Sequence, residues 1–189
     1  MVEDYTKTKY FKYLLNNHKE IDRERISFNK EILELLNRKV DELGTILKCH
    51  LILEFYIDKY LEAAYPTVTN WQNSRLTFAQ KLEIINNSKT PIGMYYSSIK
   101  CLNSLRNKFS HKISYKVEDK DYKEITEIMT CWYDALGDPV LKGMELIENF
   151  TIWVCGSING MINGINKETK NFGLPAYLHW LENMQQPDE

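Results

Sequence analysis

Three residues in one short stretch could do chemistry together: Arg106, Asn107 and His111. A histidine can take the proton of a ribose 2′-hydroxyl or protonate a leaving 5′-oxygen near neutral pH. An arginine can bind a phosphate through two hydrogen bonds and stabilise its developing charge, and an asparagine can orient the phosphate or the imidazole. This trio therefore indicates RNA cleavage. No metal or other cofactor is expected, because the 2′-hydroxyl is the nucleophile, and DNA lacks that hydroxyl.

The residues around this trio are basic, although the whole chain has a net charge of −2. No acidic residue stands between Lys100 and Lys116. A nucleic-acid site in such a chain has to be a local basic patch. The candidate RNA-binding residues are Lys100, Lys108, Lys112, Lys116 and the neighbouring Tyr115. On spacing alone, an arginine and a histidine at a basic helix end are more often solvated surface residues than a catalytic pair.

The trio stands at the end of a predicted helix over about residues 93–111. An apolar stripe with steps of three and four is complete without the trio: Tyr95, Ile99, Leu102, Leu105 and Phe109. On an ideal helix Asn107 and His111 share a face, whereas Arg106 and His111 diverge by about 140°. To bring the arginine and the histidine together, the helix end must be distorted or a second copy of the motif must lie across a dimer interface.

The remaining periodic runs predict an all-α fold, because glycine and proline are sparse and clusters such as Gly137-Asp138-Pro139 separate the runs. Helices are predicted within residues 4–24, from the N-cap Ser27 to about 65, and over 77–85, 93–111, 122–136, 141–165 and 175–184. This order indicates an up-and-down helical bundle over residues 27–137. A polar N-terminal segment (1–26) precedes it, and extra C-terminal helices (138–189) are expected to pack on the same domain.

Three polar residues of the predicted helix over residues 27–65 stand in line with apolar ones. For His50 this favours a core histidine with a hydrogen-bond partner over a catalytic one. Glu54 and Asp58 also need an explanation, since an acid on an apolar line needs a partner. Arg106 is a candidate partner if the helices pack side by side, so both acids could support the site. Both could instead lie solvated at the edge of the apolar face.

Gly156, Gly160 and Gly164 are spaced four apart, so on a helix they form a flat strip that another backbone can approach closely. Each glycine costs about 1 kcal/mol in helix propensity, which indicates a packing role. The strip could pack within the chain or form a dimer interface. It is no phosphate loop, because no strand precedes it and no Lys-Ser/Thr pair follows it.

Several classes of function are disfavoured by composition. The cysteines are far apart and predict reduced, mostly buried thiols in a cytoplasmic protein. No apolar run reaches the roughly 20 residues that a membrane span requires. The histidines share no ligand spacing with one another or with the cysteines, so no metal site is expected.

The segment Arg106-Asn107-Lys108-Phe109-Ser110-His111 resembles the HEPN motif, an arginine followed by a polar residue and then by a histidine. The approach over residues 99–107 resembles the family as well. So does the upstream order of a long helix with His50-Leu51-Ile52-Leu53-Glu54 and a short segment beginning at Phe78. The likeness covers about residues 27–137 and is closest to the mannitol operon repressor and related branches.

The resemblance implies a homodimer in which two motifs form one composite cleft. In catalytic members, the residues matching Arg106 and His111 carry metal-independent endoribonuclease activity, and Asn107 matches the polar position. Such members are often toxins or antiphage and stress effectors, for which an antitoxin or a nucleotidyltransferase would be a partner. Repressor-like members regulate or bind without demonstrated cleavage, so a non-catalytic regulator remains the alternative. Residues 138–189 match no part of the family pattern.

Overall fold

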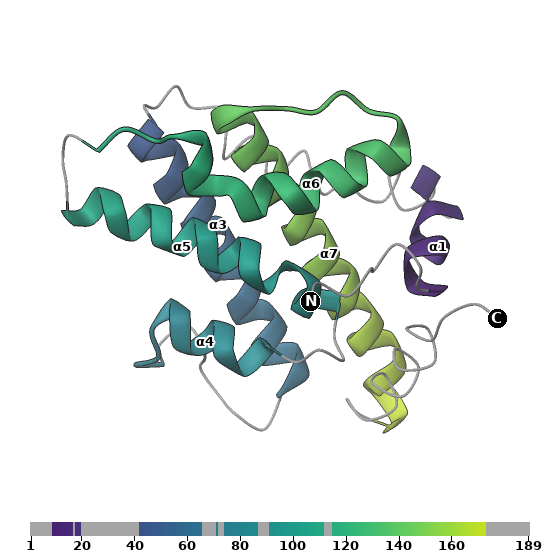
Figure 1. Cartoon of the computed structure of the whole chain (residues 1–189). Coiled ribbons are helices and arrows are strands. Elements are labelled where there is room, and N and C mark those ends of the chain that lie inside the picture. Colours follow the sequence, from purple (N-terminus) through teal and green to yellow (C-terminus); the bar gives the residue numbers. More distant parts are fainter. Residues whose placement is uncertain are drawn as a thin grey trace.

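The computed structural model describes residues 9–16, 18–19, 42–65, 71, 74–86, 91–111 and 115–172, and at a few of these positions, His111 and 167–172 among them, the backbone alone. Every regular element in this part of the chain is helical. The elements are α1 (Lys9–Asn16), α3 (Glu42–Ala64), α4 (Phe78–Ile85), η3 (Pro91–Tyr95), α5 (Tyr96–His111), η4 (Asp119–Tyr122), α6 (Lys123–Leu136) and α7 (Gly143–Phe172). The predicted all-α class is confirmed, and the elements pack as a helical bundle (Figure 1). The predicted helix over 175–184 and the N-cap Ser27 lie outside the described residues.

Local signals explain where several helices begin and end. Thr77 caps α4: the amide of Gln80 donates to Thr77 Oγ1 at 3.3 Å, and the amide of Thr77 donates to Gln80 Oε1 at 2.9 Å. This reciprocal capping box satisfies backbone donors that the helix cannot satisfy itself. α6 ends at Gly137, whose φ of 74° lies in the left-handed region that glycine adopts without strain.

Several predicted boundaries differ from the structure. The helix predicted to end near residue 165 continues in α7 to Phe172. The helix predicted from residue 93 begins as the 3₁₀ turn η3 and becomes α-helical only at Tyr96. Tighter 3₁₀ turns are common at the N-terminal ends of α-helices. Between the helices predicted over 93–111 and 122–136, residues 119–122 form the 3₁₀ turn η4, and Asp121 in that turn is buried.

The core centres on α3 and α7, which make the most extensive contact between described elements. Fully buried apolar side chains come from both helices: Ile46, Leu53, Ile57 and Leu61 from α3, and Phe150, Val154, Ile158 and Ile165 from α7. All belong to one hydrophobic cluster. In Figure 1, α5 and α6 lie across this pair. The region beyond residue 138 thus supplies one of the two central helices of the bundle.

α5 carries the candidate site and contacts α3, α4 and α6. Its predicted apolar stripe is confirmed, since all five side chains are buried: Tyr95, Ile99, Leu102, Leu105 and Phe109. Burying a large apolar side chain contributes about 1.5–3 kcal/mol. These contacts fix the rotation of α5 about its own axis, so they also decide which polar side chains of α5 face the neighbouring helices.

Gly160 lies on the exposed surface of α7, and a Cβ built there would meet no atom within 4 Å. The interpretation of the glycine strip as tight packing within the chain is therefore wrong at Gly160. Gly156 and Gly164 are half-buried. Dimerisation through the strip stays a prediction.

Replacing Gly160 with alanine should raise the free energy of unfolding by about 0.5–1 kcal/mol, because alanine favours the helix and meets no neighbour. Gly137 is the matched control with the opposite sign, since a Cβ at its positive φ should cost about 1–2 kcal/mol. Urea unfolding followed by circular dichroism measures both. If Gly160→Ala lost stability and turned a dimer into a monomer, the strip would instead be an interface.

Candidate functional site

Arg106 and Asn107 stand in the last turns of α5, on the flank of its buried stripe. Arg106 is half-buried and Asn107 is exposed. Arg106 Nη1 donates a hydrogen bond to Asn107 Oδ1 at 3.1 Å, so the structure brings these two predicted residues together. Ser110 Oγ donates to the carbonyl of Arg106 at 3.1 Å and occupies that backbone acceptor. The hydrogen bond to Asn107 therefore orients the Arg106 guanidinium.

His111 is the last residue of α5. Its side chain lies outside the described residues, as does the whole of Lys112. The convergence of the imidazole with Arg106 therefore stays a prediction. The backbone places residue 111 one turn beyond Asn107, as the last residue of α5.

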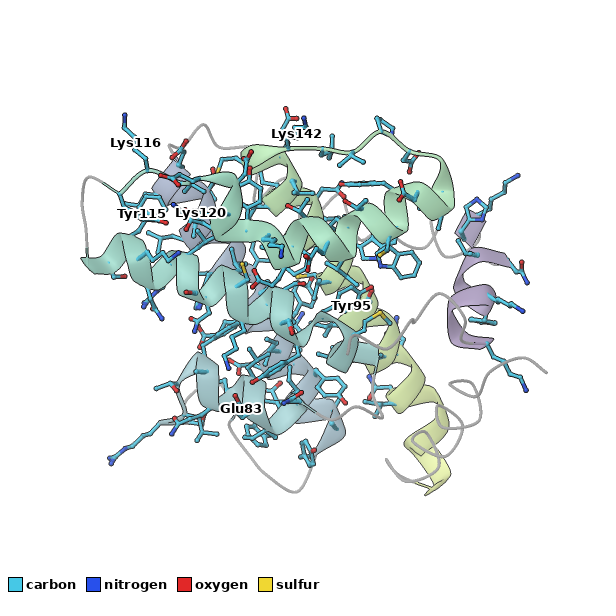
Figure 2. All side chains as sticks on the ribbon, in the orientation of Figure 1. Glu83, Tyr95, Tyr115, Lys116, Lys120 and Lys142 are labelled. Atoms are coloured by element: carbon cyan, nitrogen blue, oxygen red, sulfur yellow. The ribbon has the colours of Figure 1, made fainter. Side chains whose placement is uncertain are left out.

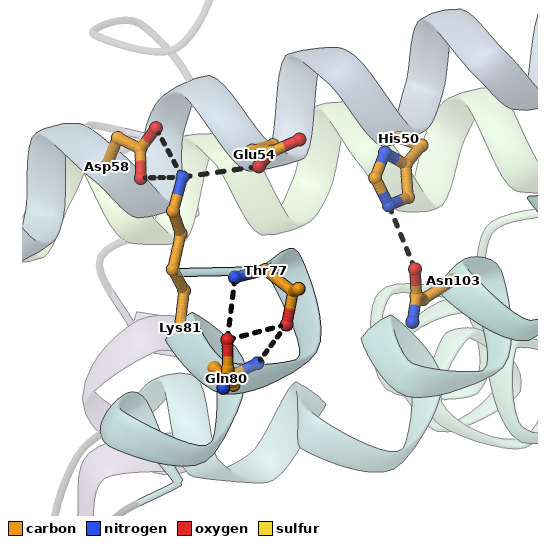
Figure 3. A network of polar contacts seen from close by, with 7 residues as sticks. All are labelled: His50, Glu54, Asp58, Thr77, Gln80, Lys81 and Asn103. Carbon is orange, nitrogen blue, oxygen red and sulfur yellow. Dashed lines mark hydrogen bonds and ion pairs between the residues drawn. The ribbon is translucent and has the colours of Figure 1, made fainter. Parts of the chain in front are cut away.

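Glu54 and Asp58 have a different partner from the one predicted. Lys81 on α4 lies 3.2 Å from Glu54 Oε1 and 2.8 Å from Asp58 Oδ1 (Figure 3). Lys81 is 3 % exposed and Asp58 is 5 % exposed, so this is a buried ion pair with a half-buried second acid. The expectation that both acids are solvated is wrong for Asp58, and the pairing with Arg106 is replaced by pairing with Lys81.

The charge state of Lys81 follows from its two acids. Burial alone would lower the pKa of Lys81, but hydrogen bonds and charges from Asp58 and Glu54 outweigh burial and raise it. Lys81 is therefore a cation that balances Glu54 and Asp58. Among the described residues no carboxylate forms a salt bridge with Arg106. The guanidinium keeps donors free for an external anion.

His50 is a buried, hydrogen-bonded histidine, as predicted for a core residue. Its Nε2 donates to Asn103 Oδ1 at 3.0 Å (Figure 3). The centroid of its ring lies 4.3 Å from that of the Phe78 ring. Burial lowers the pKa of His50; the hydrogen bond to Asn103 and the charge of Glu54 oppose this, and the charge of Arg106 adds to it. His50 is therefore held in the core, where its proton on Nε2 is used by Asn103.

The predicted RNA-binding residues differ in their surroundings. Lys108 Nζ lies 2.7 Å from Asp121 Oδ1, and its ammonium also stands over the Tyr115 ring, 5.7 Å from the centroid. Tyr115 packs edge-on against Phe109. Lys100 is exposed beside the Tyr96 ring. Lys116 is exposed as well, and Figure 2 shows Tyr115, Lys116 and Lys120 on the segment between α5 and α6.

Asp121 was not predicted as a partner of Lys108, because it lies beyond the basic stretch that ends at Lys116. Asp121 neutralises Lys108 across the turn that follows α5, so the basic patch is weaker than the sequence indicates. Burial alone would raise the pKa of Asp121, but hydrogen bonds from Lys108, Tyr115 and the Glu118 amide outweigh it and lower the pKa to about 2. This carboxylate ties the segment after the motif back onto α5.

Asp121→Asn should lower the free energy of unfolding at pH 7 by about 2 kcal/mol, because a pKa lowered from 3.8 to about 2 corresponds to that energy. The folded pKa lies below the unfolded one, so the contribution is present above pH 3.8 and disappears as the pH falls toward 2. Wild type and variant should therefore converge near pH 2 in urea titrations. Asp134→Asn, at an exposed carboxylate, is the control. If the difference in unfolding free energy between wild type and Asp121→Asn stayed constant with pH, the Asp121 carboxylate would not be its source.

Asn103 and Lys81 were also missed as members of the site. A lysine on the apolar side of a short helix and an asparagine one turn before Arg106 were the available signals. Neither signal says which residues of α3 face them, because that depends on how α3, α4 and α5 pack. The structure supplies this pairing.

Comparison of the chain with protein-family models, with curated proteins and with solved structures finds no match. The resemblance to the HEPN motif thus rests on the residues that carry it. Among the described helices, none is long and apolar enough to cross a membrane.

Proposed function

We propose that the chain is a metal-independent endoribonuclease of the HEPN kind, with Arg106, Asn107 and His111 as its catalytic residues. The observation that carries the proposal is the state of Arg106. Arg106 is half-buried at the end of α5, and its hydrogen bond to Asn107 is exposed. It has no carboxylate partner among the described residues, because Glu54 and Asp58 are paired with Lys81. An arginine whose guanidinium is accessible and keeps free donors is suited to bind a phosphodiester.

In the proposed reaction the ribose 2′-oxygen attacks the adjacent phosphorus, and the bond from phosphorus to the 5′-oxygen breaks. The products are a 2′,3′-cyclic phosphate and a free 5′-hydroxyl. His111 takes the proton of the 2′-hydroxyl or gives a proton to the 5′-oxygen, and in a homodimer the two copies of His111 can divide these roles. Arg106 stabilises the charge that develops on the phosphate, and Asn107 holds the guanidinium in place.

The remaining basic residues would contact the RNA backbone around this centre. Lys100 and Lys116 are exposed and can do so directly. Lys108 shares its charge with Asp121 and contributes less. We propose that the protein acts in the cytoplasm as a toxin or as an antiphage or stress effector, under the control of an antitoxin or a nucleotidyltransferase.

The chemical signature of the products tests this proposal. An end-labelled RNA should be cut to fragments ending in a 2′,3′-cyclic phosphate. The same oligonucleotide with one 2′-deoxyribose at the cleaved position should resist cutting there and remain sensitive elsewhere. Cutting at the deoxy position would contradict attack by the 2′-hydroxyl. Expression of the wild type should be toxic and that of His111→Ala should not; a wild type that cuts no RNA and is harmless favours the non-catalytic regulator.

A further inference from the structure

Asn103 shares a helix face with the residues of the proposed centre. It precedes Arg106 by three positions and Asn107 by four, the spacing at which helix side chains are neighbours. Asn103 contacts His50 on α3. Arg106 donates to Asn107, which stands one turn beyond Asn103 on α5, so the guanidinium is held on the turn that adjoins Asn103.

The contact with His50 fixes which way the Asn103 amide points. Asn103 Oδ1 lies 3.0 Å from His50 Nε2, and because a carbonyl oxygen can only accept, the histidine proton is on Nε2. The Asn103 nitrogen then points away from His50, as Figure 3 shows. His50 is 5 % exposed and packed against Phe78, so it is a rigid donor.

The amide nitrogen of Asn103 carries two N–H donors, and no described residue accepts from them. The oxygen, which would repel an anion, is occupied by His50. What remains available is a donor beside a guanidinium that has no acidic partner in the described part of the chain. Two such groups on one face suit two oxygens of one phosphate.

We infer that Asn103 is a further phosphate-binding residue of the Arg106 centre, and that buried His50 is the positioning residue that turns its amide nitrogen toward the phosphate. The inference rests on the proposed function, since it names a second binding group for the same phosphodiester. It assigns a purpose to a buried histidine that takes no direct part in the proposed cleavage.

Binding of a 2′-O-methyl RNA oligonucleotide tests the inference, because this probe keeps the phosphates but cannot be cleaved. Fluorescence anisotropy should show about tenfold to a hundredfold weaker binding for Asn103→Ala, the loss of one hydrogen bond to a charged group. Ser104→Ala, at the neighbouring exposed position, should bind like wild type. Arg106→Ala should also bind weakly.

The role of His50 is tested through Asn103. His50→Leu removes the donor and frees the amide to turn, so binding should weaken about twofold to tenfold. His50→Gln keeps an N–H donor near the place of Nε2 and should restore wild-type binding, which also covers a failure of His50→Leu to fold. In the Asn103→Ala background, changing His50 to leucine should have no further effect on affinity.

The outcomes separate this inference from the proposed function. Wild-type affinity in Asn103→Ala, with weak binding in Arg106→Ala, would overturn the inference and leave phosphate binding by Arg106 in place. Additive losses from the His50 and Asn103 variants would overturn the positioning role. Equal affinity of wild type and Arg106→Ala would show that Arg106 does not bind the phosphate. The proposed function would then fail together with the inference.

Discussion

Arg106→Ala should slow RNA cleavage by about 10²–10³-fold, the usual effect of removing a preorganised donor that stabilises developing charge. The fold should survive the change, because the guanidinium forms no described salt bridge and its described hydrogen bond goes to the adjacent Asn107. The free energy of unfolding should change by no more than about 0.5 kcal/mol. Single-turnover cleavage rates and urea titrations on the same preparations measure the two quantities.

Arg106→Lys separates charge from geometry at this position. Lysine keeps the positive charge but cannot form two parallel hydrogen bonds with one phosphate, so its rate should fall between those of wild type and the alanine variant. Lys100→Ala, at another exposed cation of α5, should slow cleavage far less. A rate for Arg106→Ala equal to that of Lys100→Ala would mean that Arg106 is one more surface cation.

Lys81→Met should lower the free energy of unfolding by about 3–5 kcal/mol, since it leaves Asp58 buried and charged with no cation. Methionine fills much of the space of the lysine stem, so the loss reports the charge rather than a cavity. Breaking a buried pair is far more costly than replacing the whole pair by apolar residues. Chemical denaturation at pH 7 measures the effect.

Two matched variants test whether the loss of stability comes from the unpaired buried charge. Lys81→Met combined with Asp58→Leu should recover most of the stability, because no unpaired buried charge remains. Lys123→Met breaks the Lys123–Glu127 pair, whose side chains are 71 % and 61 % exposed, and should change the free energy of unfolding by less than about 1 kcal/mol. If Lys81→Met were as mild as Lys123→Met, the buried ion pair would not hold α4 onto α3.

Helical periodicity was sufficient to predict the fold class and the apolar face of α5. The stripe from Tyr95 to Phe109 is buried as predicted, and the helix predicted over 77–85 is α4 (Phe78–Ile85). These features are local, because each depends on spacing within one helix. The short 3₁₀ turn before Tyr96 escaped the prediction, since the stripe continues through it without a break.

Contacts between helices could not be predicted from spacing alone. Lys81, rather than Arg106, pairs with Asp58, and Asp121 approaches Lys108 from beyond the basic stretch. Each pairing depends on the rotation of one helix against another, which the sequence of either helix does not specify. The open space at Gly160 is a further case, because a glycine in a helix has the same sequence signature whether or not another backbone approaches it.

The position of Asn103 illustrates the same point within the candidate site. Its place one turn before Arg106 is visible in the sequence, but its significance depends on His50 lying across from it. The sequence singled out Arg106, Asn107 and His111 through the family resemblance. The contact between Asn103 and His50 could be described only once the packing of α3 and α5 was known.

Cleavage of a labelled structured RNA in EDTA by wild type and by His111→Ala, at matched folding, tests the central claim most directly. The account predicts that wild type alone cuts the RNA and leaves a 2′,3′-cyclic phosphate, since His111 moves the proton and no metal is needed. Equal behaviour of the two proteins on several RNAs, whether both cut or both fail, would contradict the assignment of His111 as the general acid/base.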